Sequence, residues 1–447
     1  MVGGVRERMA SPGPGTATGR DPVIDLVRFF CLALVVVGHC MMVSPVLHAD
    51  GTVTTENTLA EQDWFVPVIW IFMVMPLFFF TGGATGLQSW RRLKAAGGTA
   101  AQFVRLRLLR LVRPAMALLA VMFLGLGAAG LMGVHPQVVQ LMVAGAAMPL
   151  WFLAAYLAAQ LNIPLLAACH TRAPWLTMAV LMALVVAVDC LRGALPALAY
   201  ANLVFLWCAV QQLGFLAADG CWARVSRSGL VGIALAANLV LGTVTGLGLY
   251  PGNMLVNLNP PTLCLLLLGV SQAAILELSR PALAPLCAVR WVHGLLYRAG
   301  VRSLTVYLWH LPLLVGMSGL LLLTPVPKPP SGTAPWWWAR PVVLLALVLL
   351  LLPVVGVFGR LEERPTAVST SRCRPPAVAA AVVVTFLPVA AAALGGLTLE
   401  LLGAGALCFA IAVLVLRGIP DRVPGPARST SRDPRRRGHP GIASGVK

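Results

Sequence analysis

The first long apolar segment of the chain, about residues 24–43, contains three ionisable side chains: Asp25, Arg28 and His39. Such side chains are costly inside a membrane and usually face protein or water. At 3.6 residues per turn, Arg28 and His39 fall within about 20° of each other on a helix and about 16 Å apart along its axis. Asp25 comes one turn before Arg28, close enough to pair with it. One helix face therefore presents an ion pair near one membrane surface and an imidazole deeper in the bilayer.

This arrangement is suited to proton transfer beside a polar route into the membrane. An imidazole changes protonation near neutral pH and can act as a general base. Asp25 and Arg28 would form a polar opening toward the cytoplasm, and His39 would be the base beyond it. The alternative is a structural role, in which these side chains stabilise helix packing and His39 bonds a neighbouring carbonyl group.

A second group of polar side chains occurs in the segment SLTVYLWHLPLL, where Ser303, Tyr307 and His310 lie on adjacent helix faces. We expect Tyr307 and His310 to support catalysis or orient a substrate, and Ser303 to contact it. The alternative for His310 is a packing role, which is common for an isolated membrane histidine. Trp151 could line a substrate cavity, although aromatic residues at the start of a span are also interfacial anchors.

The composition indicates which elements position these residues. Of the 447 residues, 59% are hydrophobic and 11% are charged, whereas an ordinary soluble domain has about 25% charged residues. The mean hydropathy is +0.86. Many apolar segments have the length that crosses the hydrocarbon core of a bilayer. These features exclude a soluble globular protein and predict an all-α polytopic integral membrane helical bundle.

Twelve segments are long and apolar enough to span a membrane. The first ten cover about 24–43, 65–88, 112–133, 148–169, 174–191, 198–216, 229–249, 260–278, 303–323 and 338–358. Two more, about 377–396 and 399–416, form an Ala, Val and Leu-rich pair joined by two glycines. We expect this pair to be a separate hairpin appended to a ten-helix core.

The basic residues are distributed as twelve membrane spans require. With the N-terminus inside, all of the 33 Lys and Arg residues lie on the inner side except Arg192, Lys328 and Arg340. We therefore expect both termini in the cytoplasm and the protein in the plasma membrane. The net charge of +18 is then explained by inner loops beside anionic lipid, without nucleic acid as a partner.

The remaining segments differ from the spans in composition. Residues 1–20 are rich in Gly, Pro, Ser and Thr and predict a disordered cytoplasmic tail. We expect the ten-helix domain to cover 21–358, a cytoplasmic linker 359–376, the extra transmembrane hairpin 377–416 and a disordered basic tail 417–447. The 10 cysteines form no Cys-x-x-Cys pair, and the loop histidines have no neighbours at ligand spacing, so we expect neither a metal nor a bound cofactor.

Five motifs, in order along the chain, resemble those of the membrane acyltransferase 3 family of multi-pass O-acyltransferases. They are the pair of Arg28 and His39, MPLFFFTGG at 75–83, RLLRLVRP at 107–114, LWFL at 150–153, and SLTVYLWHLPLL at 303–314. The resemblance covers about 24–358. The chain departs from the usual pattern at Thr81-Gly82-Gly83, where many members have Ser-Gly. A high Arg-to-Lys ratio and many Ala, Gly and Pro residues are typical of GC-rich genomes, so the resemblance is to bacterial members of the actinobacterial type.

This resemblance implies transfer of an acyl group, commonly acetyl, from cytoplasmic acyl-CoA to a hydroxyl of a glycan, lipid or other envelope acceptor. His39 would be essential for transfer, with Arg28 and Asp25 beside it. A hydroxyl is a poor nucleophile, so an imidazole that accepts its proton would assist attack on the thioester.

The resemblance also gives a role to Arg107, Arg110 and Arg113, which recur at every third position before the third span. These side chains could bind the phosphates of acyl-CoA, a donor co-substrate that approaches from the cytoplasm. Interfacial anchoring of the helix is the alternative, since basic residues before a span are expected whatever the function.

A transporter or lipid flippase is the competing prediction, because twelve spans with both termini inside is also a frequent transporter topology. Two observations count against it. The sequence has no evident internal repeat, and its ionisable residues are concentrated in the first span instead of at paired positions in two halves. A third possibility, a non-catalytic scaffold for envelope assembly, leaves the polar residues of the first span without a purpose.

Overall fold

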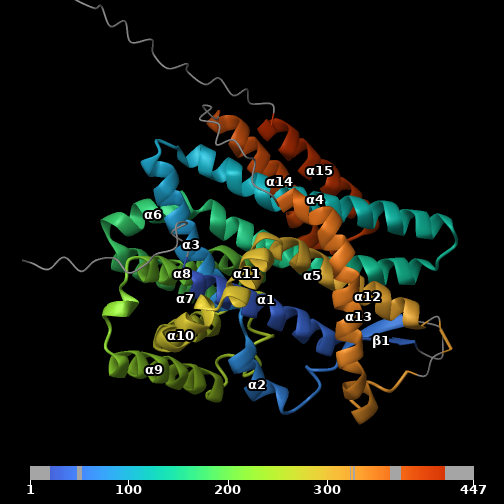
Figure 1. The fold of residues 1–447 in the computed structure, drawn as a ribbon, viewed down its shortest axis with the longest axis horizontal. Coiled ribbons are helices and arrows are strands. Elements are labelled where there is room, and N and C mark those ends of the chain that lie inside the picture. Colours follow the sequence, from blue (N-terminus) through green and yellow to red (C-terminus); the bar gives the residue numbers. More distant parts are fainter. Residues whose placement is uncertain (1–20, 48–52, 323, 326–327, 363–373, 418–447) are drawn as a thin grey trace, which may run out of the picture.

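The protein is a bundle of membrane-length helices, as the sequence predicts (Figure 1). The computed structural model describes residues 21–47, 53–322, 324–325, 328–362 and 374–417. Twelve helical segments within these residues are long and apolar enough to cross a membrane. The expected terminal tails, 1–20 and most of 417–447, lie outside the described residues. The fold is therefore that of an all-α integral membrane protein.

The helices are α1 (Pro22–Met42), α2 (Phe65–Phe72), α3 (Met75–Ala95), α4 (Ala100–Leu131), α5 (Pro136–Leu161), α6 (Ile163–Arg172), α7 (Pro174–Leu191), α8 (Asn202–Ala218), α9 (Arg227–Gly246), α10 (Leu263–Ala288), α11 (Arg290–Val301), α12 (Ser303–Leu322), α13 (Ala334–Phe358), α14 (Pro375–Gly395) and α15 (Leu399–Arg417). Short 3-10 helices are η1 (Pro196–Ala201), η2 (Trp222–Arg224) and η3 (Gly359–Glu362). Two strands, β1 (Val43–Leu47) and β2 (Val53–Asn57), pair in antiparallel fashion.

Several helices extend beyond the predicted spans. The helix that contains the third predicted span starts before 112, because α4 is a single helix of 32 residues that begins at Ala100. Its start is a capping box, in which Thr99 accepts from the N–H of Gln102 and Gln102 accepts from the N–H of Thr99. The helix at the fourth predicted span, 148–169, begins earlier, at Pro136, and ends at Leu161. Consequently Arg107 and Arg110 lie on the same continuous helix as the apolar part of α4.

The second predicted span, 65–88, is broken into α2 and α3. Pro76 has no N–H to continue the hydrogen-bond pattern of a helix, and it occupies the first turn of α3. The carbonyl oxygen of Met73, left at the break, accepts a hydrogen bond of 2.8 Å from Nε2 of Gln272 on α10. Non-helical backbone at membrane depth is tolerated where the protein satisfies it in this way. The residues at the break, Val74 and Met75, line the pocket described below.

Glycines allow α3 and α8 to pack with their backbones close together. A Cβ atom added at Gly83 would overlap the carbonyl oxygen of Gln211, and one at Gly214 would overlap the carbonyl oxygen of Phe80. Close approach of small residues is a general means of helix association in membranes. Gly83 of the Thr81-Gly82-Gly83 motif thus has a structural role in holding α3 against α8.

The predicted outer loop between the first two spans contains the β1–β2 hairpin, which the sequence did not indicate. The hairpin is tied to the start of α13, since Nε1 of Trp336 donates to Oγ of Ser44 at 3.1 Å. Trp336 is 2% exposed, so its indole is enclosed by protein, whereas the neighbouring Trp338 is exposed.

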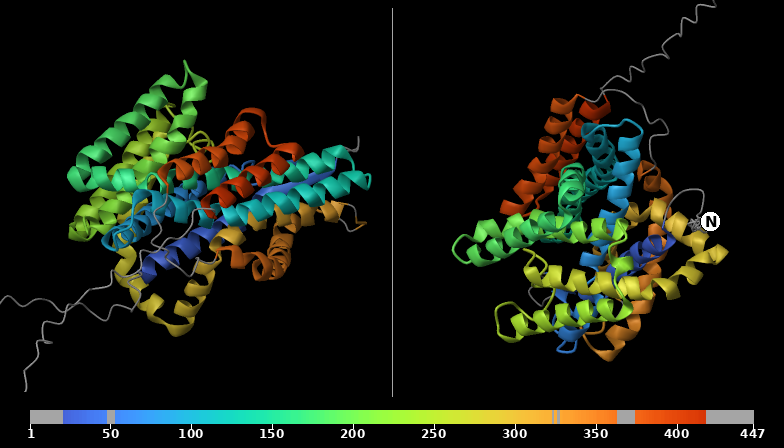
Figure 2. Two further views of the ribbon diagram at one scale, coloured as in Figure 1. Left: turned by 90° about the horizontal axis from the view of Figure 1, so that it is seen from above. Right: turned by 90° about the vertical axis from the view of Figure 1, so that its left-hand side faces the viewer.

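The C-terminal pair α14 and α15 packs against α4, as both views of the bundle show (Figure 2). Arg105 on α4 donates from Nε to the carbonyl oxygen of Leu416 at 2.9 Å. The ring of Phe123, also on α4, lies close to the backbone of Gly403. The hairpin therefore extends the core at the face formed by α4.

Candidate functional site

His39 on α1 and His310 on α12 are directly hydrogen-bonded. The distance between Nδ1 of His39 and Nε2 of His310 is 2.8 Å, and the ring planes differ by 14°. His310 is fully buried, while His39 is partly buried. The two histidines, separated by 271 positions in the sequence, were predicted to act in one site, and the fold brings them together.

The surroundings of His310 determine which nitrogen atoms carry protons. Nδ1 of His310 faces the carbonyl oxygen atoms of Tyr307 and Val306, at 2.6 and 3.3 Å. Carbonyl oxygens only accept, so Nδ1 of neutral His310 must hold the proton and its Nε2 must accept. Nδ1 of His39 is then the donor, and Nε2 of His39 carries the lone pair. No side chain among the described residues bonds to that Nε2 atom, which leaves it available as a base.

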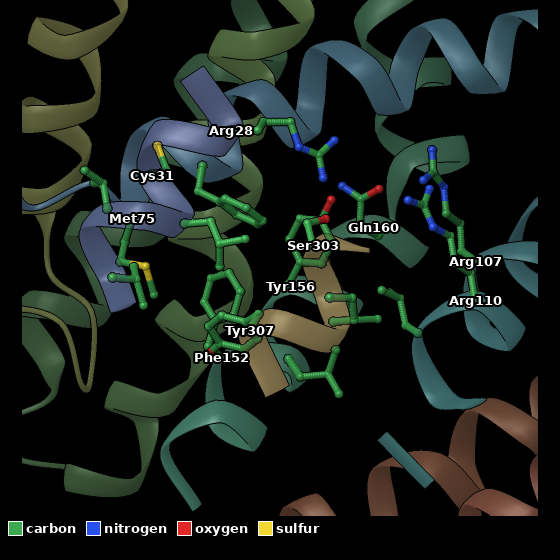
Figure 3. Close-up of a pocket in the computed structure, with 17 residues that line it drawn as sticks. Arg28, Cys31, Met75, Arg107, Arg110, Phe152, Tyr156, Gln160, Ser303 and Tyr307 are labelled. Carbon is green, nitrogen blue, oxygen red and sulfur yellow. The ribbon is translucent and has the colours of Figure 1, made fainter. Parts of the chain in front are cut away.

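A pocket lies between α1, the α2–α3 break, α4, α5 and α12 (Figure 3). It contains about 790 Å³ of space, part of it open to solvent. Arg28, Arg107, Arg110, Gln160 and Ser303 contribute its polar lining. Three of these are the arginines that the sequence assigned to substrate entry and phosphate binding. An anionic group could be held here, because guanidinium groups bind phosphate through several hydrogen bonds at once.

Arg28 is held by α3. Its Nη1 atom lies 3.5 Å from Oγ1 of Thr85, and its guanidinium lies 5.5 Å from the centre of the Phe78 ring. Cation–π contact with an aromatic face is a favourable environment for arginine. Arg28 thus contacts two side chains of α3. Its pairing with Asp25 stays a prediction.

The opposite end of the pocket is apolar and approaches the histidine pair. Val35 and Tyr307 line the pocket and stand one helical turn before His39 and His310, respectively. The rings of Tyr307 and His310 are 5.7 Å apart. Phe152 packs against Tyr307 with ring centres 4.9 Å apart. The sequence predicts one groove shared by Arg28 and His39. The pocket lining among the described residues includes Arg28 and ends one turn short of His39.

Three other predicted site residues, Asp25, Arg113 and Trp151, do not contribute to the lining of this pocket within the described part of the chain. Trp151 donates from Nε1 to Oδ1 of Asn259 at 3.0 Å, a contact with the loop before α10. Ser303, at the first position of α12, lines the pocket, and its contact with a substrate stays a prediction.

Sequence reasoning missed Glu362, which fixes the start of α12. Glu362 is 3% exposed. It accepts from the backbone N–H groups of Leu304 at 3.2 Å and Thr305 at 2.5 Å, and from the Thr305 hydroxyl. The first N–H groups of a helix have no partner within the helix, so an acidic side chain there is stabilising. The only signal in the sequence is an acidic residue after the last core span.

A second unpredicted polar group joins α3, α6 and α8. His170 is 3% exposed; its Nε2 lies 3.0 Å from Oδ2 of Asp219 and its Nδ1 lies 2.7 Å from Nε2 of Gln212. Arg91 pairs with the same carboxylate. Hydrogen bonds from Arg91, and then from His170, lower the pKa of Asp219, although burial partly opposes them. His170 was interpreted as a loop residue, whereas it belongs to this buried network.

Comparison with known proteins places the chain in a family. No curated protein and no solved structure matches the chain. A family model described as an acyltransferase domain matches residues 21–360, which include the histidine pair and the whole pocket. No group of three metal-ligating side chains occurs within the described residues. The chain belongs to the membrane acyltransferase 3 family and is an enzyme that transfers acyl groups other than aminoacyl groups.

Proposed function

We propose that the protein moves an acyl group, with acetyl as the first candidate, from cytoplasmic acyl-CoA to a hydroxyl of an envelope glycan or lipid. The observation that carries this proposal is the His39–His310 hydrogen bond, which leaves Nε2 of His39 as a lone-pair base. The pocket with three arginines in its lining supports a polyanionic donor. The distribution of basic residues supports a plasma-membrane location with both termini in the cytoplasm.

His39 acts on the acceptor hydroxyl. Its Nε2 atom removes the hydroxyl proton while the oxygen forms a bond to the thioester carbon. The carbon–sulfur bond then breaks, and the CoA thiolate leaves and takes up the proton that His39 gained. The products are an ester and CoA with a free thiol, so no oxidant or reductant is needed. His310 holds His39 in the required tautomer by accepting from Nδ1, and is itself held by the carbonyl oxygen of Tyr307.

The donor would occupy the pocket with its phosphates at the arginines. Arg107 and Arg110 lie on α4 and Arg28 on α1, so two helices contribute guanidinium groups to the pocket. The thioester would lie toward Val35 and Tyr307, one helical turn from His39 and His310. The aromatic rings at that end exclude water, which limits hydrolysis of the thioester.

The proposal is tested with purified protein in nanodiscs, acetyl-CoA labelled in the acetyl group, and a panel of envelope glycans and lipids. We expect label to appear in at least one acceptor, as an ester that mild base releases. Reversing the charge of Arg107 and Arg110 to Glu should raise the concentration of acetyl-CoA needed, without lowering the amount of inserted protein. A protein that transfers no label from any acyl-CoA to any acceptor of the panel contradicts the proposal.

The competing transporter hypothesis is tested in the same preparation. The family assignment favours acyl transfer over solute movement. Proteoliposomes that move a lipid or solute without CoA, and transfer no acyl group, would favour the transporter.

A further inference from the structure

Gln160 on α5 has one polar atom without a partner, in the lining of the donor pocket. The residue is 1% exposed. Its Nε2 atom donates to the carbonyl oxygen of Gly82 at 3.3 Å and to Oε1 of Gln211 at 3.1 Å. Its Oε1 atom is buried and has no hydrogen-bond partner among the described residues. Figure 3 shows its carboxamide at the polar end of the pocket.

The orientation of this carboxamide is determined by its neighbours. Gln211 donates from Nε2 to the carbonyl oxygen of Ala159 at 3.0 Å, so the Oε1 atom of Gln211 is an acceptor. Gln160 must therefore present its nitrogen to Gln211 and to the carbonyl oxygen of Gly82. A flipped carboxamide would place oxygen against two oxygens. The atom of Gln160 without a partner is therefore the acceptor Oε1, and not the donor Nε2.

A buried acceptor without a partner is destabilising, and native proteins contain few of them. Five other buried side-chain atoms in the described residues lack a partner: those of Asn202, Trp207, Gln212, Gln272 and Trp309. None of these five residues lines the pocket. Gln160 differs because it is the member of this group that a ligand in the pocket would approach.

The order of groups along the pocket matches the order of groups along an acyl-CoA molecule. Figure 3 shows Arg107 and Arg110 at one end, Gln160 next to them, and Tyr307 farther along the pocket. The ring of Tyr307 is 5.7 Å from that of His310. In acyl-CoA the phosphates are followed by the pantetheine arm, which carries two amide N–H groups, and then by the thioester. The part of the donor next to Gln160 is thus the part that offers N–H donors.

We propose that Oε1 of Gln160 accepts a hydrogen bond from an amide N–H of the pantetheine arm and thereby holds the donor in the pocket. This inference rests on acyl-CoA being the donor. Gln160 is then a donor-binding residue, which contacts the donor away from the reacting atoms. Because the bond would form equally in the ground state and in the transition state, its loss should weaken donor binding and leave the rate of the chemical step nearly unchanged.

The test measures the Kd of acetyl-CoA for the full chain in nanodiscs, which needs no acceptor. Gln160→Met removes the acceptor while keeping the side-chain volume, and we expect the Kd to rise about fivefold. The matched control is Gln212→Met, which removes another buried, unpartnered glutamine oxygen away from the pocket. Gln212→Met should leave the Kd unchanged. Equal Kd values for wild type and Gln160→Met, in folded protein, would overturn the proposal.

Two acetyl-CoA analogues identify which amide N–H bonds to Gln160. They also distinguish loss of this bond from misfolding of the variant. In each, one amide of the pantetheine arm is replaced by an ester, so one N–H is lost. We expect one analogue to bind wild type more weakly than acetyl-CoA does, and to bind Gln160→Met as well as acetyl-CoA does. If, for both analogues, the loss of affinity caused by the missing N–H simply adds to the loss caused by Gln160→Met, the contact is refuted. If acetyl-CoA does not bind wild type at all, the donor assignment fails. If acetyl-CoA binds wild type tightly and Gln160→Met does not change its Kd, the Gln160 contact is refuted and the donor assignment is not.

Discussion

At the scale of single residues, the catalytic proposal depends on the proton positions in the His39–His310 pair. His310 accepts from His39 only because its own Nδ1 donates to the carbonyl oxygen of Tyr307. A backbone carbonyl, placed by the regular geometry of α12, thus determines where the lone pair of His39 lies. This chain of hydrogen bonds makes His310 a positioning residue, because it acts through His39.

We expect His310→Ala to lower kcat for acyl transfer about 100-fold, because Nδ1 of His39 loses its acceptor and the tautomer is no longer held. The Kd for acetyl-CoA should stay near the wild-type value, since His310 does not line the pocket. His310→Gln keeps an acceptor oxygen and should recover part of the rate. His293→Ala on the exposed face of α11 is the control. A fully active His310→Ala enzyme would show that the pair is structural.

Parts of the site were predictable from residue types and spacing, and others were not. Arg28 and His39 were found because ionisable side chains are rare in an apolar segment. Their partners were harder to predict, since Thr85 and Phe78 belong to another helix and depend on how α1 packs on α3. Gln160 could not be identified from the sequence, because its importance lies in one unpartnered atom that exists only in the folded chain.

At the scale of elements, the site is held by a broken helix, a close pair of helices and a capped helix start. The break between α2 and α3 places Val74 and Met75 at the pocket, the glycines fix α3 on α8, and Glu362 fixes the start of α12. Apolar length predicts spans well but contains no information on a break that another helix supports through Gln272. The same limit explains why the β1–β2 hairpin was missed.

Gly83→Ala should destabilise the protein by about 1–3 kcal/mol, because the added methyl group overlaps backbone of α8 and forces α3 away. The midpoint of thermal unfolding in detergent measures this effect. Gly242→Ala on α9 is the matched control, since no atom lies within 4 Å of the added Cβ. That substitution should leave the midpoint equal or slightly higher. A Gly83→Ala protein as stable as Gly242→Ala would contradict the packing argument.

Glu362→Gln should lower both stability and activity, because its carboxyl group accepts from two N–H groups at the start of the helix that carries His310. The expected loss of stability is about 1–3 kcal/mol. Thermal unfolding and the rate of acyl transfer are measured on the same preparation. Glu61→Gln, on an exposed segment before α2, should change neither quantity. If both variants behave like wild type, Glu362 does not hold α12.

The Asp219 network predicts how stability depends on pH. Arg91 and His170 lower the pKa of Asp219 in the folded protein, whereas an unfolded aspartate titrates near about 3.9. The stabilisation is therefore present above that value and is lost as the pH falls through the lower, folded pKa. We expect the unfolding midpoint of wild type to fall more steeply below about pH 4 than that of Asp219→Asn. Parallel curves for the two proteins would contradict this assignment.

At the scale of the whole molecule, the twelve candidate spans agree in number with the apolar segments of the sequence. The family model ends at residue 360, and α14 and α15 lie beyond it against α4. Charge asymmetry gives the expected direction of insertion, with the polar end of the pocket facing the cytoplasm. A donor made in the cytoplasm could then reach the arginines directly.

This topology is tested with alkaline phosphatase fusions, which are active only outside the cytoplasm. A fusion after Gly133, between α4 and α5, should be active, and a fusion after Arg417, at the end of α15, should be inactive. The opposite pattern would invert the membrane orientation and move the pocket opening to the outer side.

The central claim is tested most directly by following labelled acetyl groups from acetyl-CoA to an acceptor with wild type and His39→Gln in nanodiscs. Both proteins should bind acetyl-CoA with similar Kd, because His39 does not line the pocket. Wild type should form labelled ester and His39→Gln should form none above background. Ester formation by His39→Gln at the wild-type rate would contradict the account of His39 as the base.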